Sequence, residues 1–119
     1  MKKILVIDDE PTIRFLLKEV ITEWGYEFLE ASRAQRGIEI IKSDKVDLVL
    51  LDIQLPQMNG LEAIQKIREI NKEIPVFMLT AFHNLKDVVS MLNVSVQQFI
   101  TKPFDIDDLY SKIKRELGE

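Results

Sequence analysis

Cysteine is absent from this chain of 119 residues, and histidine occurs only once, as His83. Without thiols the protein has no disulfide bonds, no thiolate zinc site and no cysteine nucleophile. One imidazole cannot by itself build a histidine-rich metal site or the usual acid–base pair. Any chemistry therefore has to come from carboxylates, hydroxyls and amines.

Long apolar runs and an excess of basic charge are also missing. The longest apolar runs, such as Leu48–Leu51, are far too short to span a membrane. The apolar start of the chain resembles a secretion signal only until Asp8-Asp9-Glu10 interrupts it. The net charge of −4 disfavours a nucleic-acid-binding module. We expect a soluble cytoplasmic protein with no membrane partner and no direct contact with nucleic acid.

The hydrophobic pattern predicts one α/β domain over residues 1–119. Short apolar runs, which alternate with amphipathic stretches, predict five strands, at Ile4–Ile7, Phe28–Leu29, Val46–Leu51, Val76–Leu79 and Val96–Ile100. Helices are predicted at Thr12–Trp24, Ala34–Ser43, Leu61–Ile70, Leu85–Leu92 and Ile106–Leu117. The first, third and fourth strands are continuously apolar, which is typical of parallel strands covered by helices on both faces.

Three aspartates follow two of these strands: Asp8 and Asp9 after the first, and Asp52 after the third. In a parallel sheet with right-handed crossovers these strand ends come together, at the edge where ligands bind. Carboxylates so placed repel one another unless a cation joins them, and Mg²⁺ prefers such oxygen ligands. Thr80 and Lys102, at the ends of the fourth and fifth strands, add a hydroxyl and an ammonium. This set is suited to handling a phosphoryl group.

Each of these residues also has a plainer interpretation. An aspartate or threonine after a strand is often only a helix cap, and a single lysine is often only a solvated charge. Capping alone does not readily explain the whole combination at the ends of four strands.

The motifs that carry these residues resemble the receiver domains of bacterial two-component response regulators. They are Ile7-Asp8-Asp9-Glu10, Leu50-Leu51-Asp52-Ile53, Pro56-Gln57-Met58-Asn59-Gly60, Leu79-Thr80-Ala81 and Thr101-Lys102-Pro103-Phe104. The resemblance covers nearly the whole chain. It implies a flavodoxin-like (βα)5 fold, a doubly wound parallel sheet with strand order 2-1-3-4-5.

The resemblance also implies a role for each site residue. Asp52 would be the phosphoacceptor, attacking a phosphohistidine on a sensor histidine kinase or histidine phosphotransferase. Asp9, Asp52 and the backbone carbonyl of Gln54 would bind Mg²⁺ (or Mn²⁺), with Asp8 acting mainly through water. Lys102 and Thr80 would contact phosphoryl oxygens.

Further positions would set the character of the receiver. Thr80 and the aromatic residue Phe99 would form the conformational switch. In the family, the positions held here by Gln54 and Phe82 tune attack by water on the aspartyl phosphate. Because Phe82 has no group to orient water, we expect slow self-dephosphorylation. Pro103 would follow a cis peptide bond, as is typical of the family.

An apolar docking surface for the histidine donor is predicted beside the site, formed by Ile13, Phe15, Leu16, Pro103 and Phe104. Phe15 points away from the core-facing stripe of its helix, although a single exposed aromatic also occurs without function. The segment Phe104–Asp107 is similar to that of the sporulation phosphorelay intermediate, a receiver that stands alone.

The leading hypothesis is a stand-alone regulator or relay intermediate that acts on a downstream protein and is not a turnover enzyme. The alternative is the receiver of a longer, DNA-binding regulator. A remote alternative is a small Mg²⁺-dependent phosphatase with an aspartate nucleophile, although such enzymes usually carry two aspartates two residues apart on the first strand. A flavin or nucleotide site is disfavoured because no glycine-rich loop follows the first strand.

Overall fold

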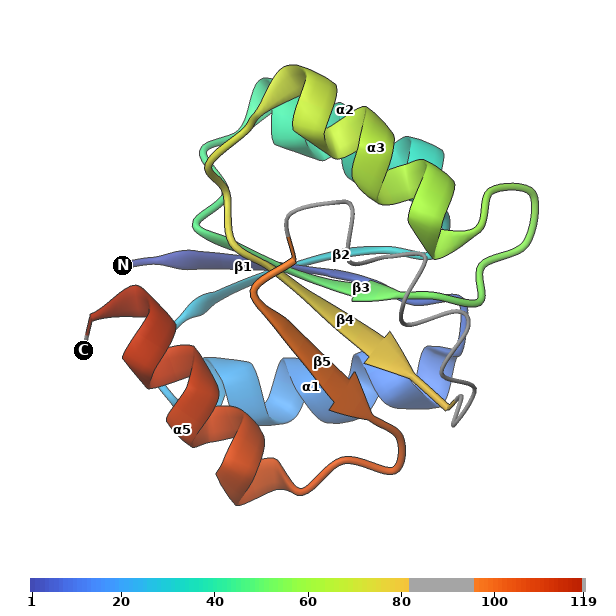
Figure 1. Cartoon of the computed structure of the whole chain (residues 1–119). Coiled ribbons are helices and arrows are strands. Elements are labelled where there is room, and N and C mark those ends of the chain that lie inside the picture. Colours follow the sequence, from blue (N-terminus) through green and yellow to red (C-terminus); the bar gives the residue numbers. More distant parts are fainter. Residues whose placement is uncertain (82–95, 119) are drawn as a thin grey trace.

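The computed structural model describes residues 1–81 and 96–118, in which strands and helices alternate (Figure 1). The strands are β1 (Lys3–Ile7), β2 (Glu27–Ala31), β3 (Leu48–Asp52), β4 (Val76–Thr80) and β5 (Gln98–Thr101). The helices are α1 (Pro11–Glu23), α2 (Ala34–Ser43), α3 (Gly60–Ile70) and α5 (Ile106–Leu117). The predicted helix at Leu85–Leu92 lies outside the described residues.

The strands form a single parallel sheet in the order β2-β1-β3-β4-β5. Helices α1 and α5 cover one face of the sheet, and α2 and α3 cover the other (Figure 1). The predicted fold class and strand order are confirmed. The order reverses between β1 and β3, so the carboxyl ends of these two strands form the crevice where ligands bind in sheets of this type.

Two apolar clusters fill the space between sheet and helices. One contains Leu5, Ile7, Val49 and Leu51 with apolar residues of α2 and α3. The other contains Ile4, Val6, Leu48 and Leu50 with apolar residues of α1 and α5. Neighbouring residues of one strand enter opposite clusters because strand side chains alternate between the faces. The continuous apolar runs of β1 and β3 are therefore explained by burial on both sides.

Strand β2 is longer than the predicted Phe28–Leu29. It pairs with β1 from Glu27 to Ala31 although two of its five side chains are exposed glutamates, Glu27 and Glu30. An edge strand needs fewer apolar residues, because backbone hydrogen bonds to β1 fix its extent. Strands β3 and β5 are instead shifted along the sequence: each begins two residues later and ends one residue later than predicted.

Local signals fix where the helices begin and end. Pro11 lies in the first turn of α1, where its missing N–H costs no hydrogen bond. Gly25 follows this helix with a φ of 92°, a left-handed conformation that glycine adopts without strain. Asn59 and Asp105 cap α3 and α5 by accepting hydrogen bonds from backbone N–H groups of the first turn.

Candidate functional site

The loop after β1 places one carboxylate inside the protein and two outside. Asp8 is fully buried, whereas Asp9 and Glu10 are exposed. The backbone N–H of Asp8 donates to the carbonyl of Ala31 at 3.1 Å, and its Oδ1 accepts from the N–H of Glu10 at 2.9 Å. These two bonds fix the direction of Asp8 at the carboxyl end of the sheet.

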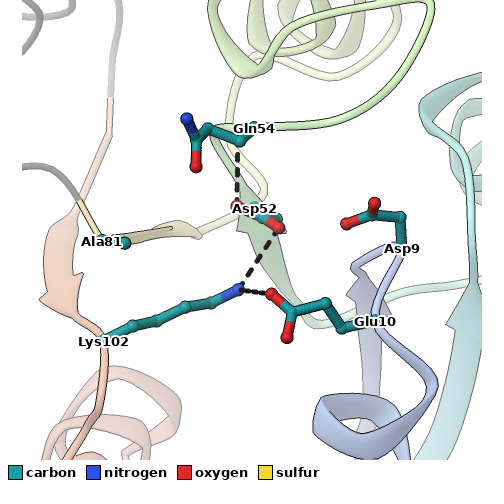
Figure 2. A pocket seen from close by; sticks show the side chains of 6 residues that line it. All are labelled: Asp9, Glu10, Asp52, Gln54, Ala81 and Lys102. Carbon is teal, nitrogen blue, oxygen red and sulfur yellow. Dashed lines mark hydrogen bonds and ion pairs between the residues drawn. The ribbon is translucent and has the colours of Figure 1, made fainter.

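Strand β3 presents the third aspartate at the same edge. Asp52 is the last residue of the strand and is only 4% exposed. Its Oδ1 accepts a hydrogen bond from the N–H of Gln54 at 3.0 Å. Its Oδ2 faces Lys102, which follows β5 (Figure 2).

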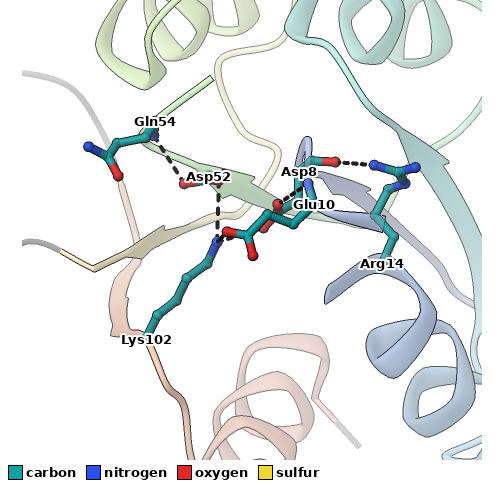
Figure 3. Close-up of polar contacts among 6 residues, drawn as sticks. All are labelled: Asp8, Glu10, Arg14, Asp52, Gln54 and Lys102. Atoms are coloured by element: carbon teal, nitrogen blue, oxygen red, sulfur yellow. Dashed lines mark hydrogen bonds and ion pairs between the residues drawn. The ribbon is translucent and has the colours of Figure 1, made fainter. Parts of the chain in front are cut away.

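Lys102 joins the two strand ends. Its Nζ lies 2.8 Å from Oδ2 of Asp8, 3.3 Å from Oδ2 of Asp52 and 3.6 Å from Oε1 of Glu10 (Figure 3). One ammonium thus pairs with three carboxylates, two from the loop after β1 and one from the end of β3. The predicted convergence of Asp8, Asp52 and Lys102 is present in the structure.

Burial and charge act on Asp52 and Lys102 in different ways. Burial raises the pKa of Asp52 from 3.8 to about 6; the Gln54 N–H opposes this rise and the charge of Asp8 adds to it. For Lys102, burial alone would lower the pKa, but hydrogen bonding and attraction to Asp8 and Asp52 raise it above its ordinary value. Lys102 therefore stays charged, and the site holds more negative charge than this one ammonium neutralises.

The site opens into a hollow of about 260 Å³, lined by Asp9, Glu10, Asp52, Gln54, Ala81 and Lys102 (Figure 2). Asp8, Asp9, Glu10 and Asp52 each offer a carboxylate oxygen, and these oxygens lie within 4.8 Å of one another. An all-oxygen set open to solvent on one side fits Mg²⁺, which keeps several of its waters. The donor chemistry therefore matches the predicted cofactor.

Thr80 and Phe99 lie on the same face of adjacent strands. Thr80 is buried at the end of β4, and its backbone carbonyl accepts from the N–H of Lys102. The register pairs Met78 with Phe99 and Thr80 with Thr101, so Phe99 lies one strand away from Thr80 and two positions earlier along the sheet. Phe99 is half-buried against the cluster on the side of α2 and α3. The second predicted tuning residue, Phe82, lies outside the described residues.

The predicted docking residues differ in exposure. Phe15 is 66% exposed and Leu16 is 41% exposed, whereas Ile13 and Phe104 pack partly against the core. Pro103 is exposed and follows a cis peptide bond from Lys102, as expected. The orientation of Phe15 away from the core is confirmed.

Two contributors near the site were missed by sequence reasoning, which gave no role to Glu10 or Arg14. Glu10 lines the hollow and pairs with Lys102; its position directly after two aspartates was the available signal. The Arg14 guanidinium reaches back from α1 to the carbonyl of Asp8 at 2.7 Å (Figure 3). No sequence pattern indicated that contact.

Comparison with known families identifies the class of protein. The family model described as the response regulator receiver domain matches residues 4–114. The chain belongs to this family, the receiver domains of two-component and phosphorelay signalling systems.

Individual relatives agree with this assignment. The chain is 34% identical to the sporulation initiation phosphotransferase F of Bacillus subtilis, over 98% of this chain and 94% of that protein. It is 38% identical to the transcriptional regulatory protein YvrH of the same organism, over 96% of this chain but only 48% of that protein. The chain thus nearly spans one relative and covers about half of another.

Solved structures show the same fold. A CheY-like receiver domain protein from Methanospirillum hungatei has a TM-score of 0.95 and 33% identity, covering 99% of this chain and 94% of that one. The response regulator TrrA from Thermotoga maritima, in complex with Mg²⁺ and BeF, has a TM-score of 0.88 and 38% identity. That match covers 98% of this chain and all of the other.

Proposed function

We propose that this receiver accepts a phosphoryl group on Asp52 from a phosphohistidine of a sensor histidine kinase or a histidine phosphotransferase. The observation that carries the proposal is the convergence of Asp52, Asp8 and Lys102 at one edge of the sheet. A buried carboxyl group with a raised pKa that lines an acidic hollow is a candidate for chemistry and not only for structure. In this proposal the chain modifies itself and does not turn over a substrate.

Besides the phosphohistidine donor, the transfer needs only one nucleophile and no further reactant. A carboxylate oxygen of Asp52 attacks the phosphorus, an O–P bond forms, and the P–N bond to the donor imidazole breaks. The electron pair of that bond remains on the imidazole nitrogen. Lys102, which already lies within 3.3 Å of Asp52, is placed to pair with the transferred phosphoryl oxygens.

A divalent cation completes this arrangement. Asp9, Asp52 and the carbonyl of Gln54 would hold Mg²⁺ or Mn²⁺, with Asp8 acting mainly through water. When bound, the cation supplies positive charge to the phosphoryl oxygens during transfer. The grouping of four carboxylates, three of which pair with the same lysine, supports this assignment.

Thr80 and Phe99 form the proposed switch. Attraction of the Thr80 hydroxyl to the phosphoryl group would vacate space into which the Phe99 ring can turn. Their common sheet face supports this coupling. In the NMR spectrum, Phe99 ring signals should shift on phosphorylation of the wild type and stay in place in Thr80→Ala; a shift of equal size in that variant excludes the mechanism.

The wider role proposed is that of a cytoplasmic stand-alone regulator or relay intermediate acting on a downstream protein. The match along nearly the full length of the Bacillus subtilis phosphotransferase supports this reading. The alternative is the receiver of a longer transcriptional regulator, supported by relatives about twice the length of this chain. Among the described residues, no helix is long and apolar enough to cross a membrane.

Intact mass spectrometry after incubation with Mg²⁺ and acetyl phosphate tests the central proposal. The wild type should gain the mass of one phosphoryl group, and Asp52→Asn and an EDTA-treated wild type should gain none. The matched control is Asp107→Asn, which changes an exposed aspartate in the first turn of α5 and should be labelled like the wild type. No adduct on the wild type, under conditions that label a related receiver, overturns the assignment of Asp52.

A further inference from the structure

Asp9 is exposed, yet hydrogen bonds fix the backbone on both sides of it. Asp8 before it donates its N–H to Ala31 and offers its carbonyl to the Arg14 guanidinium. Glu10 after it donates its N–H to the Asp8 carboxylate and offers its carbonyl to the N–H of Arg14 at 3.1 Å. Two of these four bonds end on Arg14, one on its side chain and one on its backbone.

The Arg14 side chain is itself held by an ion pair with β2. Nε of Arg14 lies 2.8 Å from Oε1 of Glu30, which belongs to the edge strand β2. The Arg14 side chain is only 18% exposed. A guanidinium can serve a carboxylate and a carbonyl at the same time because its donors point in fixed, diverging directions. Arg14 thereby connects three parts of the protein, namely α1, the loop that follows β1, and the edge strand β2.

We propose that Arg14 is a positioning residue for the divalent-cation site, acting by fixing the backbone that carries Asp8 and Asp9. The inference rests on the proposed function, since it concerns how the cation is held. Mg²⁺ requires near-ideal octahedral geometry, so ligands on a loosened loop bind it less well. Groups that orient metal ligands without touching the metal typically contribute 10–100-fold to metal affinity.

Charge alone makes the opposite prediction. Arg14 is a cation close to a group of carboxylates, so its removal should draw Mg²⁺ more strongly if only electrostatic attraction matters. Positioning predicts weaker binding on the same substitution. The sign of the change in affinity therefore distinguishes the two effects.

The experiment is a calorimetric titration of the metal-free protein with Mg²⁺ near neutral pH. Arg14→Gln should raise the Kd for Mg²⁺ about tenfold with the stoichiometry unchanged. Arg14→Lys keeps the charge but loses the diverging donors of the guanidinium, so its Kd for Mg²⁺ should still rise severalfold. Glu30→Gln should weaken binding in the wild-type background and have no effect in Arg14→Gln, because Glu30 acts only through the arginine.

The matched control is Arg36→Gln, which removes an exposed arginine that pairs with Glu39 on α2. Its Kd should equal that of the wild type. Circular dichroism and the fluorescence of Trp24 verify that each variant is folded, and Arg14→Lys and Glu30→Gln carry the test if Arg14→Gln is not. Unchanged or tighter Mg²⁺ binding by the folded Arg14 variants overturns the positioning role. Absence of Mg²⁺ binding by the wild type overturns the proposed function itself.

Discussion

Ionisation of the Asp52 side chain is unfavourable in the folded protein. The carboxylate is nearly buried beside Asp8, and burial raises its pKa to about 6. A folded protein that binds a proton more tightly than its unfolded chain loses stability as that proton leaves. The metal-free receiver should therefore be less stable when Asp52 is ionised, which is the state that the proposed nucleophilic attack requires.

The pH dependence of unfolding tests this cost. The unfolded pKa is near 3.8 and the folded pKa is about 6, so the contribution of Asp52 to stability falls as pH rises between these values. Asparagine does not titrate. In EDTA, the free energy of unfolding of Asp52→Asn, relative to wild type, should increase by about 2 kcal/mol between pH 4 and pH 7. Urea denaturation at each pH measures this difference.

Glu69→Gln provides the comparison for the pH experiment, because Glu69 is exposed on α3. Its stability relative to wild type should change little across the same range. A constant difference between Asp52→Asn and wild type would show that Asp52 titrates normally.

The side chain of Phe82 is the basis for a prediction about the lifetime of the phosphorylated state. It offers no group that could orient water, so hydrolysis should be slow. Phe82→Glu supplies such a group and should shorten the half-life of the phosphorylated protein by at least about tenfold. The decay of the phosphorylated mass after removal of the donor measures it. A longer half-life in Phe82→Glu than in wild type contradicts the prediction.

At the scale of elements, the start of α3 shows how closely a helix must approach β3, the strand that ends at Asp52. A Cβ atom on Gly60 would lie 2.6 Å from Cα of Ile53 and 2.9 Å from Cε of Met78. The methionine can move, but the backbone of Ile53 cannot move without displacing the loop after Asp52. Glycine is required at this position by space and not by an unusual φ angle.

Gly60→Ala should therefore destabilise the protein by about 2 kcal/mol, although alanine favours helices by about 1 kcal/mol. The steric clash outweighs the helix propensity because it involves backbone. Thermal or urea unfolding measures the change. Lys66→Ala, at an exposed position of the same helix, should leave stability nearly unchanged. A stabilised Gly60→Ala would mean that the loop yields easily.

The exposed side of α1 carries the prediction about partners. Phe15 is 66% exposed and so contributes little to stability, but it lies on the helix that follows the acidic loop. Phe15→Ala should slow phosphotransfer from the cognate donor about tenfold, as expected for an interface anchor, with unchanged labelling by acetyl phosphate. Ile70→Ala, a change in an exposed apolar residue on the opposite side of the sheet, is the control. Unchanged transfer in Phe15→Ala contradicts the docking role.

For the whole molecule, the site and the fold are thermodynamically linked. A cation that binds only the folded state stabilises it, by about 3 kcal/mol at a concentration of 100 Kd. Mg²⁺ should therefore raise the unfolding free energy of the wild type by this amount. Asp9→Asn should lose most of the increase. Trp24, the sole tryptophan, packs against Tyr110 with ring centroids 4.8 Å apart, so its fluorescence reports on unfolding.

Sodium chloride at equal ionic strength separates binding from screening in this experiment, because screening acts on all charges alike. It should produce only a small part of the stabilisation. An equal effect of both salts would show that no specific cation site exists.

The sequence by itself determined the class of fold and most of the site. Continuous apolar runs predicted buried parallel strands, and aspartates at their ends predicted an acidic edge, because both patterns follow from local periodicity and from the geometry of parallel sheets. The extent of β2 could not be predicted, since Glu27 and Glu30 interrupt its apolar pattern and pairing with β1 sets its length.

Only the tertiary structure decided which charged side chains pair with one another and which of them hold the backbone of the site. The ammonium of Lys102 reaches Asp8 across 94 residues of sequence, and Arg14 bridges the loop after β1 to Glu30 of β2. Such contacts depend on where long, flexible side chains end once several elements have packed together. Local sequence limits backbone conformation, but the final partners of a lysine or an arginine depend on the whole fold.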